Sequence, residues 1–160
     1  MTPIAVIAID GVLKDAASST PIPTGRRLYT TLASSYRLFL VEDTPVDPLW
    51  LLIDGFDTHQ TVINRLPEDP EDRAIRRIRQ IERIRGMGGT VELLVEPDPL
   101  VVAAVTRLGV VCLHYVDPPY ARPEFHPDRR EEITPWNQMV EELEQQKIIR
   151  AADNRMFEED

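Results

Sequence analysis

Short apolar segments alternate with longer amphipathic segments along most of the chain. The apolar segments, bounded by polar or glycine-containing positions, predict β-strands, and the amphipathic segments between them predict helices. The expected strands lie in residues 4–13, 36–41, 59–64, 90–95 and 110–114. Because strands that alternate with helices form parallel sheets, the pattern predicts an α/β three-layer sandwich, Rossmann-like, with a five-stranded parallel sheet.

Four helices are expected between these strands, and a fifth near the C-terminus. Thr24 and Asp98 are predicted N-caps, and Pro48 and Pro99 suit the first turn of a helix. The expected ranges of the first, second and fourth helices are 24–35, 45–54 and 98–108, and the third follows residues 66–72. In the second helix the expected apolar face consists of Leu49, Trp50, Leu52 and Ile53.

The third predicted helix combines an isoleucine stripe with many arginines. Isoleucines recur at helical spacing and predict its buried face: Ile75, Ile78, Ile81 and Ile84. The arginines follow an acidic start, an order that suits the helix dipole: Arg73, Arg76, Arg77, Arg79, Arg83 and Arg85. They predict a solvated face, with a patch for phosphate or an acidic partner as the alternative.

The first apolar stretch, residues 4–13, is apolar on both faces and stops at Asp10 and Gly11. Such a strand suits the centre of a parallel sheet that helices cover on both sides. Ligands of these sheets bind beyond the carboxyl ends of the strands. Asp10 is therefore a candidate site residue, and Gly11 allows a sharp turn beside it.

The residues Ala8-Ile9-Asp10-Gly11-Val12-Leu13 resemble the first motif of the haloacid dehalogenase (HAD) superfamily, Asp-x-Asp-Gly-Thr/Val-Leu. Most members are magnesium-dependent phosphatases, in which the first Asp attacks phosphorus and binds the metal and the second is the general acid/base. Asp10 matches the second Asp, whereas Ala8 stands at the first. A methyl group can neither attack phosphorus nor hold Mg²⁺. The resemblance therefore implies a capless HAD-like fold, with strand order 5-4-1-2-3, that lacks its nucleophile.

Later segments resemble the family in pattern and depart from it in chemistry. The family has a phosphate-binding Ser or Thr after the second strand, where this chain has Glu42, and Thr44 comes two residues later. After the fourth strand, Pro97 stands where a metal-binding Asp is expected, between Glu96 and Asp98. For the phosphate-binding Lys or Arg of the family, the candidates are Arg65 and Arg73.

These comparisons define the candidate site. The vestigial catalytic positions are Ala8, Asp10, Glu42 and Thr44, and the candidate ligand-binding residues are Asp10, Gly11, Thr44, Arg65 and Arg73. If the site is active, Mg²⁺ would be held by Asp10, Glu96 and Asp98, because hard cations take oxygen ligands. The alternative for Asp98 is a plain helix N-cap. No cofactor is expected if the site is inactive.

Composition narrows the class of protein. Across 160 residues, 42% are hydrophobic and 28% charged, which is typical of a globular domain. The net charge of −9 disfavours nucleic acid as a partner. No apolar run approaches the ~20 residues needed to span a bilayer, and the N-terminus is unlike a signal peptide. The single cysteine, Cys112, lies in an apolar run and is expected to be a buried, inert thiol. These features predict a cytoplasmic protein.

The last third of the chain differs in character. Residues 1–115 are expected to form the α/β domain and residues 116–160 a proline-rich extension with a helix. That helix should begin at Thr134, and its apolar face consists of Trp136, Met139, Val140 and Leu143. It is expected to pack on the domain, on a protein partner or on a second copy, and the charged end beyond Lys147 to fray or to bind. The Arg-Pro-Glu of residues 122–124, followed by Pro-Trp, resembles small HAD-like proteins of tailed phages, which implies a place in the host cytoplasm or the virion.

Three functions follow as expectations. The first is a non-catalytic HAD-like protein that acts as a binding or structural subunit. The second is a divergent magnesium-dependent phosphatase or phosphotransferase that uses Asp10. The third is a sensor of a nucleotide or small anion, which the acidic residues at this edge of the sheet disfavour.

Overall fold

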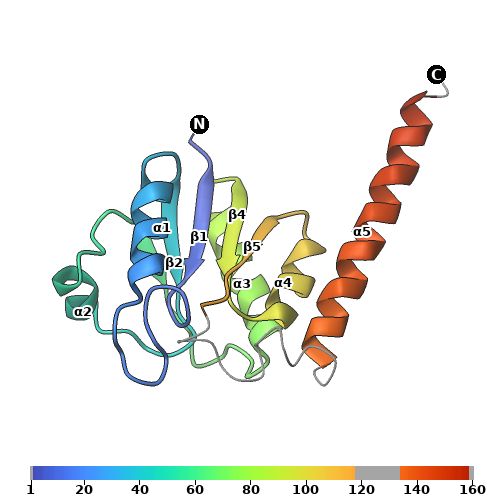
Figure 1. The fold of residues 1–160 in the computed structure, drawn as a ribbon. Helices are drawn as coiled ribbons and strands as arrows, with labels where there is room; N and C mark the ends of the chain where they lie inside the picture. The colour runs from blue at the N-terminus through green and yellow to red at the C-terminus, as the bar shows by residue number, and fades with distance from the viewer. Residues whose placement is uncertain (1, 118–133, 159–160) are drawn as a thin grey trace.

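The structure is a computed structural model that describes residues 2–117 and 134–158. Five strands form one all-parallel sheet in the order β3-β2-β1-β4-β5, with helices on both faces (Figure 1). The bounds of the strands are β1 Ile4–Ala8, β2 Arg37–Val41, β3 Thr61–Ile63, β4 Val91–Glu96 and β5 Val111–His114. This is the predicted strand order read from the other edge, so the predicted α/β fold with a parallel sheet is confirmed.

The central strand is β1, as its sequence predicts. All five of its residues are buried. It pairs with β2, where Ala8 lies opposite Val41, and with β4, where Ile7 lies opposite Val95. Since neighbouring residues in register point to the same face of a parallel sheet, Ala8 and Val41 share one face.

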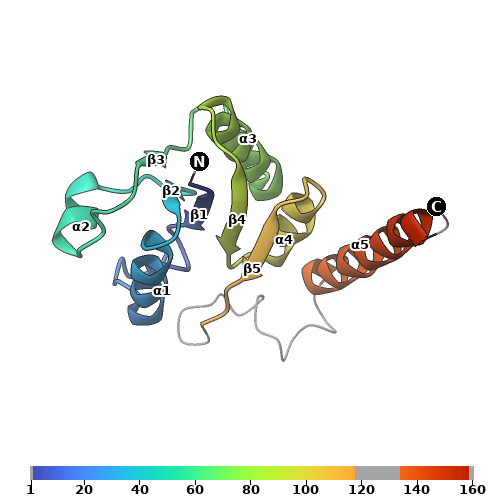
Figure 2. The same cartoon turned by 90° about the horizontal axis from the view of Figure 1, so that it is seen from above.

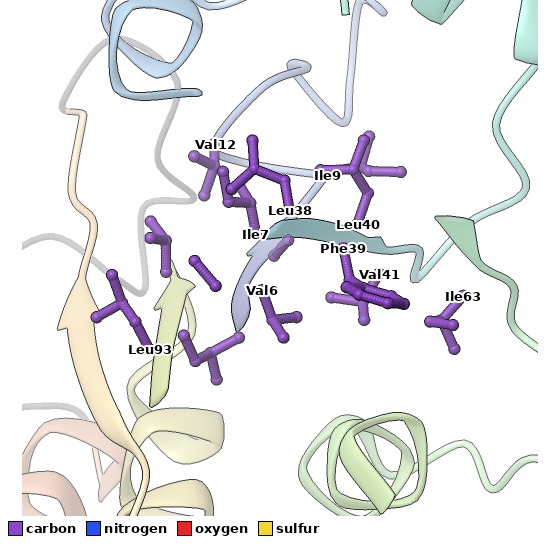
Figure 3. Packing of buried hydrophobic residues seen from close by; sticks show 14 of the residues in the cluster. Val6, Ile7, Ile9, Val12, Leu38, Phe39, Leu40, Val41, Ile63 and Leu93 are labelled. Atoms are coloured by element: carbon purple, nitrogen blue, oxygen red, sulfur yellow. The ribbon is translucent and has the colours of Figure 1, made fainter. Parts of the chain in front are cut away.

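Helices cover the two faces unequally. α1 (Pro23–Ala33) lies on one face, whereas α3 (Arg73–Gly86) and α4 (Pro99–Thr106) lie on the other (Figure 2). The short α2 (Pro48–Ile53) lies near β3 at one edge. In the core, Val41, Phe39 and Ile63 lie towards α3, and Ile7 and Leu38 towards the opposite side (Figure 3).

Two predictions about the first two helices were wrong in detail. α1 begins one residue before Thr24, and its N-cap is Ile22, which makes no side-chain cap. Pro23 in the first turn explains this start, because proline fixes a helical φ and has no N–H to satisfy. In α2 the predicted apolar face is exposed at Leu49, Leu52 and Ile53, and only Leu51 is buried. This helix is too short and too peripheral to bury more.

The prediction for α3 was half right. Ile81 and Ile84 are fully buried, but Ile75 is 48% exposed. The arginine-bearing face was predicted to be solvated, yet Arg76 and Arg77 are buried. The expected N-cap of α4 is confirmed, since the side chain of Asp98 accepts a hydrogen bond from the backbone N of Leu100.

α5 runs from Thr134 to Glu158, so the predicted start of the last helix is confirmed, and the helix includes the charged residues beyond Lys147. Met139 is buried beside α4, whereas Val140 and Leu143, predicted on the same apolar face, are exposed. The proline-rich residues 118–133 lie outside the described residues. None of the described helices is both long and apolar enough to cross a membrane.

Candidate functional site

The carboxyl ends of β1, β2 and β4 meet at one edge of the sheet, where the predicted site lies. Asp10 follows β1, Asp43 and Thr44 follow β2, and Glu96 is the last residue of β4. Ala8, where the resemblance implies a nucleophile, is the last residue of β1 and is fully buried. The topology thus brings polar groups from three strands around a methyl group.

Asp10 and Thr44 are brought together. The hydroxyl of Thr44 donates a hydrogen bond of 2.6 Å to Asp10 Oδ2. Lys14 Nζ lies 3.9 Å from Asp10 Oδ1, which is buried and accepts no hydrogen bond within the described chain. Thr44 therefore lies beside Asp10, although it comes two residues later in the chain than the Ser or Thr that the resemblance implies.

The loop after β1 packs tightly against the loop after β4. Gly11 has a φ of 88°, and a Cβ atom there would lie 2.9 Å from Cγ of Pro97. Backbone conformation and the nearness of Pro97 each require glycine at this position. Pro97, which replaces the expected metal-binding Asp, thus fills the space beside Gly11.

Glu42 holds two loops together. Its carboxylate accepts hydrogen bonds from the backbone N of Val46, at 3.1 Å, and of Arg65, at 3.0 Å. These bonds join the segment after β2 to the segment after β3. Glu42 is buried, and backbone N–H groups are the hydrogen-bond donors to its carboxylate.

A buried cluster of charges that the sequence analysis missed lies under this edge, and we call it the Arg77 cluster. The guanidinium of Arg77 donates to Asp43 Oδ2 at 2.6 Å and to Glu96 Oε2 at 2.9 Å. Its third partner is Gln80 Oε1, at 2.6 Å, and Arg76 donates to Asp43 Oδ1 at 3.0 Å. The cluster thus bridges the ends of β2 and β4, on either side of β1.

Gln80 completes the Arg77 cluster from α3. Its amide donates to the backbone O of Glu42 at 2.9 Å, so the helix also holds the end of β2 through its backbone. Arg77, Gln80, Ile81 and Ile84 follow the i, i+3, i+4, i+7 spacing of one helical face. This spacing could have indicated the burial of Arg77 from the sequence, because Gln80 and Arg77 lie on the same helical face as the buried isoleucines.

Burial and charge shift the pKa values of this cluster in different directions. Burial and repulsion from Asp43 and Asp98 raise the pKa of Glu96 to about 7, against the attraction of Arg77. Burial alone would raise the pKa of Asp43, but the charge and hydrogen bond of Arg77 and the hydrogen bond of Arg76 outweigh burial and lower this pKa. The two carboxylates raise the pKa of Arg77, which remains a guanidinium cation at every relevant pH.

The two predicted phosphate-binding arginines have partners within the protein. Arg65 pairs with Glu71 at 2.8 Å and donates to the backbone O of Asp43 at 3.2 Å. Arg73 pairs with Asp98 at 3.0 Å. Asp98 is thus the N-cap of α4, as predicted, and also the partner of an arginine, which was not predicted.

The residues do not fit the magnesium site that the family resemblance implies. Glu96 faces the Arg77 guanidinium, and the carboxylate of Asp98 is shared between Leu100 N and Arg73. Among the described residues no group of three or more His, Cys, Asp or Glu is placed to hold a metal ion. Asp43, Glu96 and Asp98 at this edge of the sheet are paired with arginines.

The geometry defines a Rossmann-like α/β protein with a polar site at the carboxyl edge of its sheet. No protein-family model matches the chain, and no curated protein is significantly similar to it.

Proposed function

We propose that this protein is a HAD-like pseudo-phosphatase: a binding or structural protein built on the scaffold of a phosphotransferase without its chemistry. The observation that carries the proposal is the buried guanidinium of Arg77, fixed between Asp43 and Glu96. In a working site of this class, a divalent cation balances the carboxylates at the strand ends. Here a side-chain cation balances them.

Ala8 supports the same proposal, because it stands where the resemblance implies the attacking residue. It has no exposed surface and no group that could form a phosphoryl intermediate. Covalent catalysis divides one difficult step into two easier ones, and its loss costs several powers of ten in rate. Asp10 accepts a hydrogen bond from the Thr44 hydroxyl and lies near Lys14, but the position from which the attacking carboxylate of such a phosphatase would act is the methyl group of Ala8.

The test is phosphate release from an aryl phosphate, a nucleotide and a sugar phosphate, each with Mg²⁺ and with Mn²⁺. We expect no release above the background of the Asp10→Asn variant. Release by the wild-type protein that disappears in Asp10→Asn would overturn the proposal in favour of a divergent phosphatase. An Arg27→Glu variant, which changes an exposed residue of α1, is purified in the same way as a control. Release that disappears in Asp10→Asn but persists in Arg27→Glu would come from this protein and not from a contaminating phosphatase.

A further inference from the structure

α5 extends well beyond the domain on which it begins. Its first turns pack on α4, where Met139 is buried and the carboxylate of Glu142 pairs with Arg107 at 3.0 Å. From residue 147 to residue 152 every position is exposed. Figures 1 and 2 both show the outer part of the helix projecting away from the sheet and its other helices. An isolated helical segment of this length is marginal in water, so a partner surface would stabilise it.

Large apolar side chains are exposed on several sides of α5, and Val140 lies on the side away from the domain. Four large apolar side chains of the helix are between 42% and 68% exposed: Val140, Leu143, Ile148 and Ile149. A hollow of about 330 Å³ on the same side is lined by Val140, Leu143 and Lys147, among others. Val140, Glu144, Lys147 and Ala151 follow a 4-3-4 spacing and form one stripe.

The charges of α5 are ordered along its length. Glu141 and Glu144 lie in the half that packs on the domain, and Lys147 and Arg150 lie at the start of the projecting half, which continues with Asp153, Arg155 and Glu158. Within one helix, Lys147 Nζ lies 3.2 Å from Glu144 Oε1. Two such helices side by side in parallel would place like charges together. In an antiparallel pair the acidic half of each helix meets the basic half of the other, and unlike charges at these positions attract.

We propose that α5 binds a second copy of this chain as an antiparallel helix pair, centred between residues 145 and 146. Glu144 of one copy then lies beside Lys147 of the other, and Val140 beside Ala151. The projecting half of each helix is covered by the domain-bound half of its partner, and Leu143 and Ile148 flank the contact. The inference names a partner for the proposed binding role and does not depend on the absence of catalysis.

The test is a pair of charge-reversed variants, measured by sedimentation velocity and light scattering. One variant, Lys147→Glu with Arg150→Glu, has an acidic helix; the other, Glu141→Lys with Glu144→Lys, has a basic one. The wild-type protein should be a concentration-dependent dimer. The dissociation constant for self-association of each variant alone should be higher by about tenfold or more. An equimolar mixture of the two variants should form a heterodimer, which also shows that both remain folded.

Three results would overturn this inference: a wild-type protein that stays monomeric up to sub-millimolar concentration, an acidic-helix variant that dimerises as tightly as the wild type, or variants that do not associate when mixed. Arg27→Glu, a charge reversal on exposed α1, is the matched control and should leave the dimer unchanged. A monomeric protein that releases no phosphate would reject the dimer and leave the proposed function in place.

Discussion

Nε of Arg77 lies 2.9 Å from Oε2 of Glu96, and neither side chain has more than 1% of its surface exposed. Removing a guanidinium and a carboxylate from water costs several kcal/mol per ion, which is recovered only where geometry and hydrogen bonds are good. Here the guanidinium of Arg77 also donates hydrogen bonds to Asp43 and Gln80. The contact therefore ties α3 to β4, and through Asp43 to β2, at the edge of the sheet where ligands of this fold class bind.

The first prediction concerns the cation of this cluster. Arg77→Met should lower the free energy of unfolding by about 3–5 kcal/mol, because Asp43 and Glu96 lose the charge that compensates their burial. Chemical denaturation of both proteins at neutral pH measures the difference. The control is Arg79→Met on the exposed side of the same helix, which should change stability by less than about 0.5 kcal/mol.

Neutralising the carboxylates should rescue that variant. Asp43→Asn and Glu96→Gln, added to Arg77→Met, replace two buried charges by amides of similar shape, and buried ion pairs can be exchanged for neutral groups at little cost. The triple variant should be more stable than Arg77→Met alone. A triple variant that is less stable would show that the loss came from packing rather than from unpaired charge.

A second prediction concerns pH. The pKa of Glu96 is raised from 4.5 in the unfolded chain to about 7 in the folded protein. Between these values the folded state holds a proton that the unfolded state has released. The contribution of Glu96 to stability is therefore full below pH 4.5 and lost as pH rises to about 7, with a slope of up to about 1.4 kcal/mol per pH unit.

Other groups titrate in the same range, so the measurement is a comparison of the wild-type protein with Glu96→Gln. Burial lowers the pKa of His59 and of His114, which stabilises the fold above their unfolded pKa of 6.5 and less so as pH falls. Those contributions have the opposite sign and are present in both proteins. The difference in unfolding free energy between the two should change between pH 4.5 and 7, and a constant difference would contradict the shift assigned to Glu96.

A third prediction concerns Ala8. Ala8→Asp places a carboxylate in a fully buried position, on the sheet face that α3 covers and where Glu96 already lies. It should destabilise the protein by about 3 kcal/mol or more, and Ala8→Asn, of equal size without the charge, should cost less. The melting temperatures of the wild-type protein and of both variants, measured with and without Mg²⁺, test this. Marked stabilisation of Ala8→Asp by Mg²⁺ would show that the metal site survives.

A fourth prediction compares two helical glycines. A Cβ on Gly25 of α1 would lie 1.6 Å from the backbone O of Val12, whereas a Cβ on Gly86 of α3 meets nothing within 4 Å. Gly25→Ala should push α1 away from the loop after β1 and cost several kcal/mol, and Gly86→Ala should be neutral or slightly stabilising. Denaturant midpoints of the two variants check this. Equal midpoints would contradict the close approach of α1 to the loop that carries Asp10.

The strands and their order could be predicted because each apolar run has its own signature. Burial on both faces identified β1 as central, and alternation with helices implied parallel pairing. Helix ends were less predictable. Ile22 rather than Thr24 precedes α1 because Pro23 sets the first turn, and α2 exposes Leu52 because little of the sheet lies beneath it.

The site was only partly predictable. Asp10 could be placed at the sheet edge because it follows the central strand, and Thr44 lies opposite it. Arg77 was assigned to solvent because a charged side chain in a helix is usually exposed. Its burial depends on Asp43 and Glu96, which are distant in sequence, so only the three-dimensional structure shows why a guanidinium is stable there.

The most direct test of the central claim, that arginine rather than a metal balances the strand-end carboxylates, is a titration of the wild-type protein with Mn²⁺ followed by electron paramagnetic resonance. Mn²⁺ takes the same oxygen ligands as Mg²⁺, and its signal falls when it binds. We predict that the wild-type signal equals that of Mn²⁺ in buffer and is unchanged by Asp10→Asn. Stoichiometric binding of Mn²⁺ that Asp10→Asn abolishes would contradict the account.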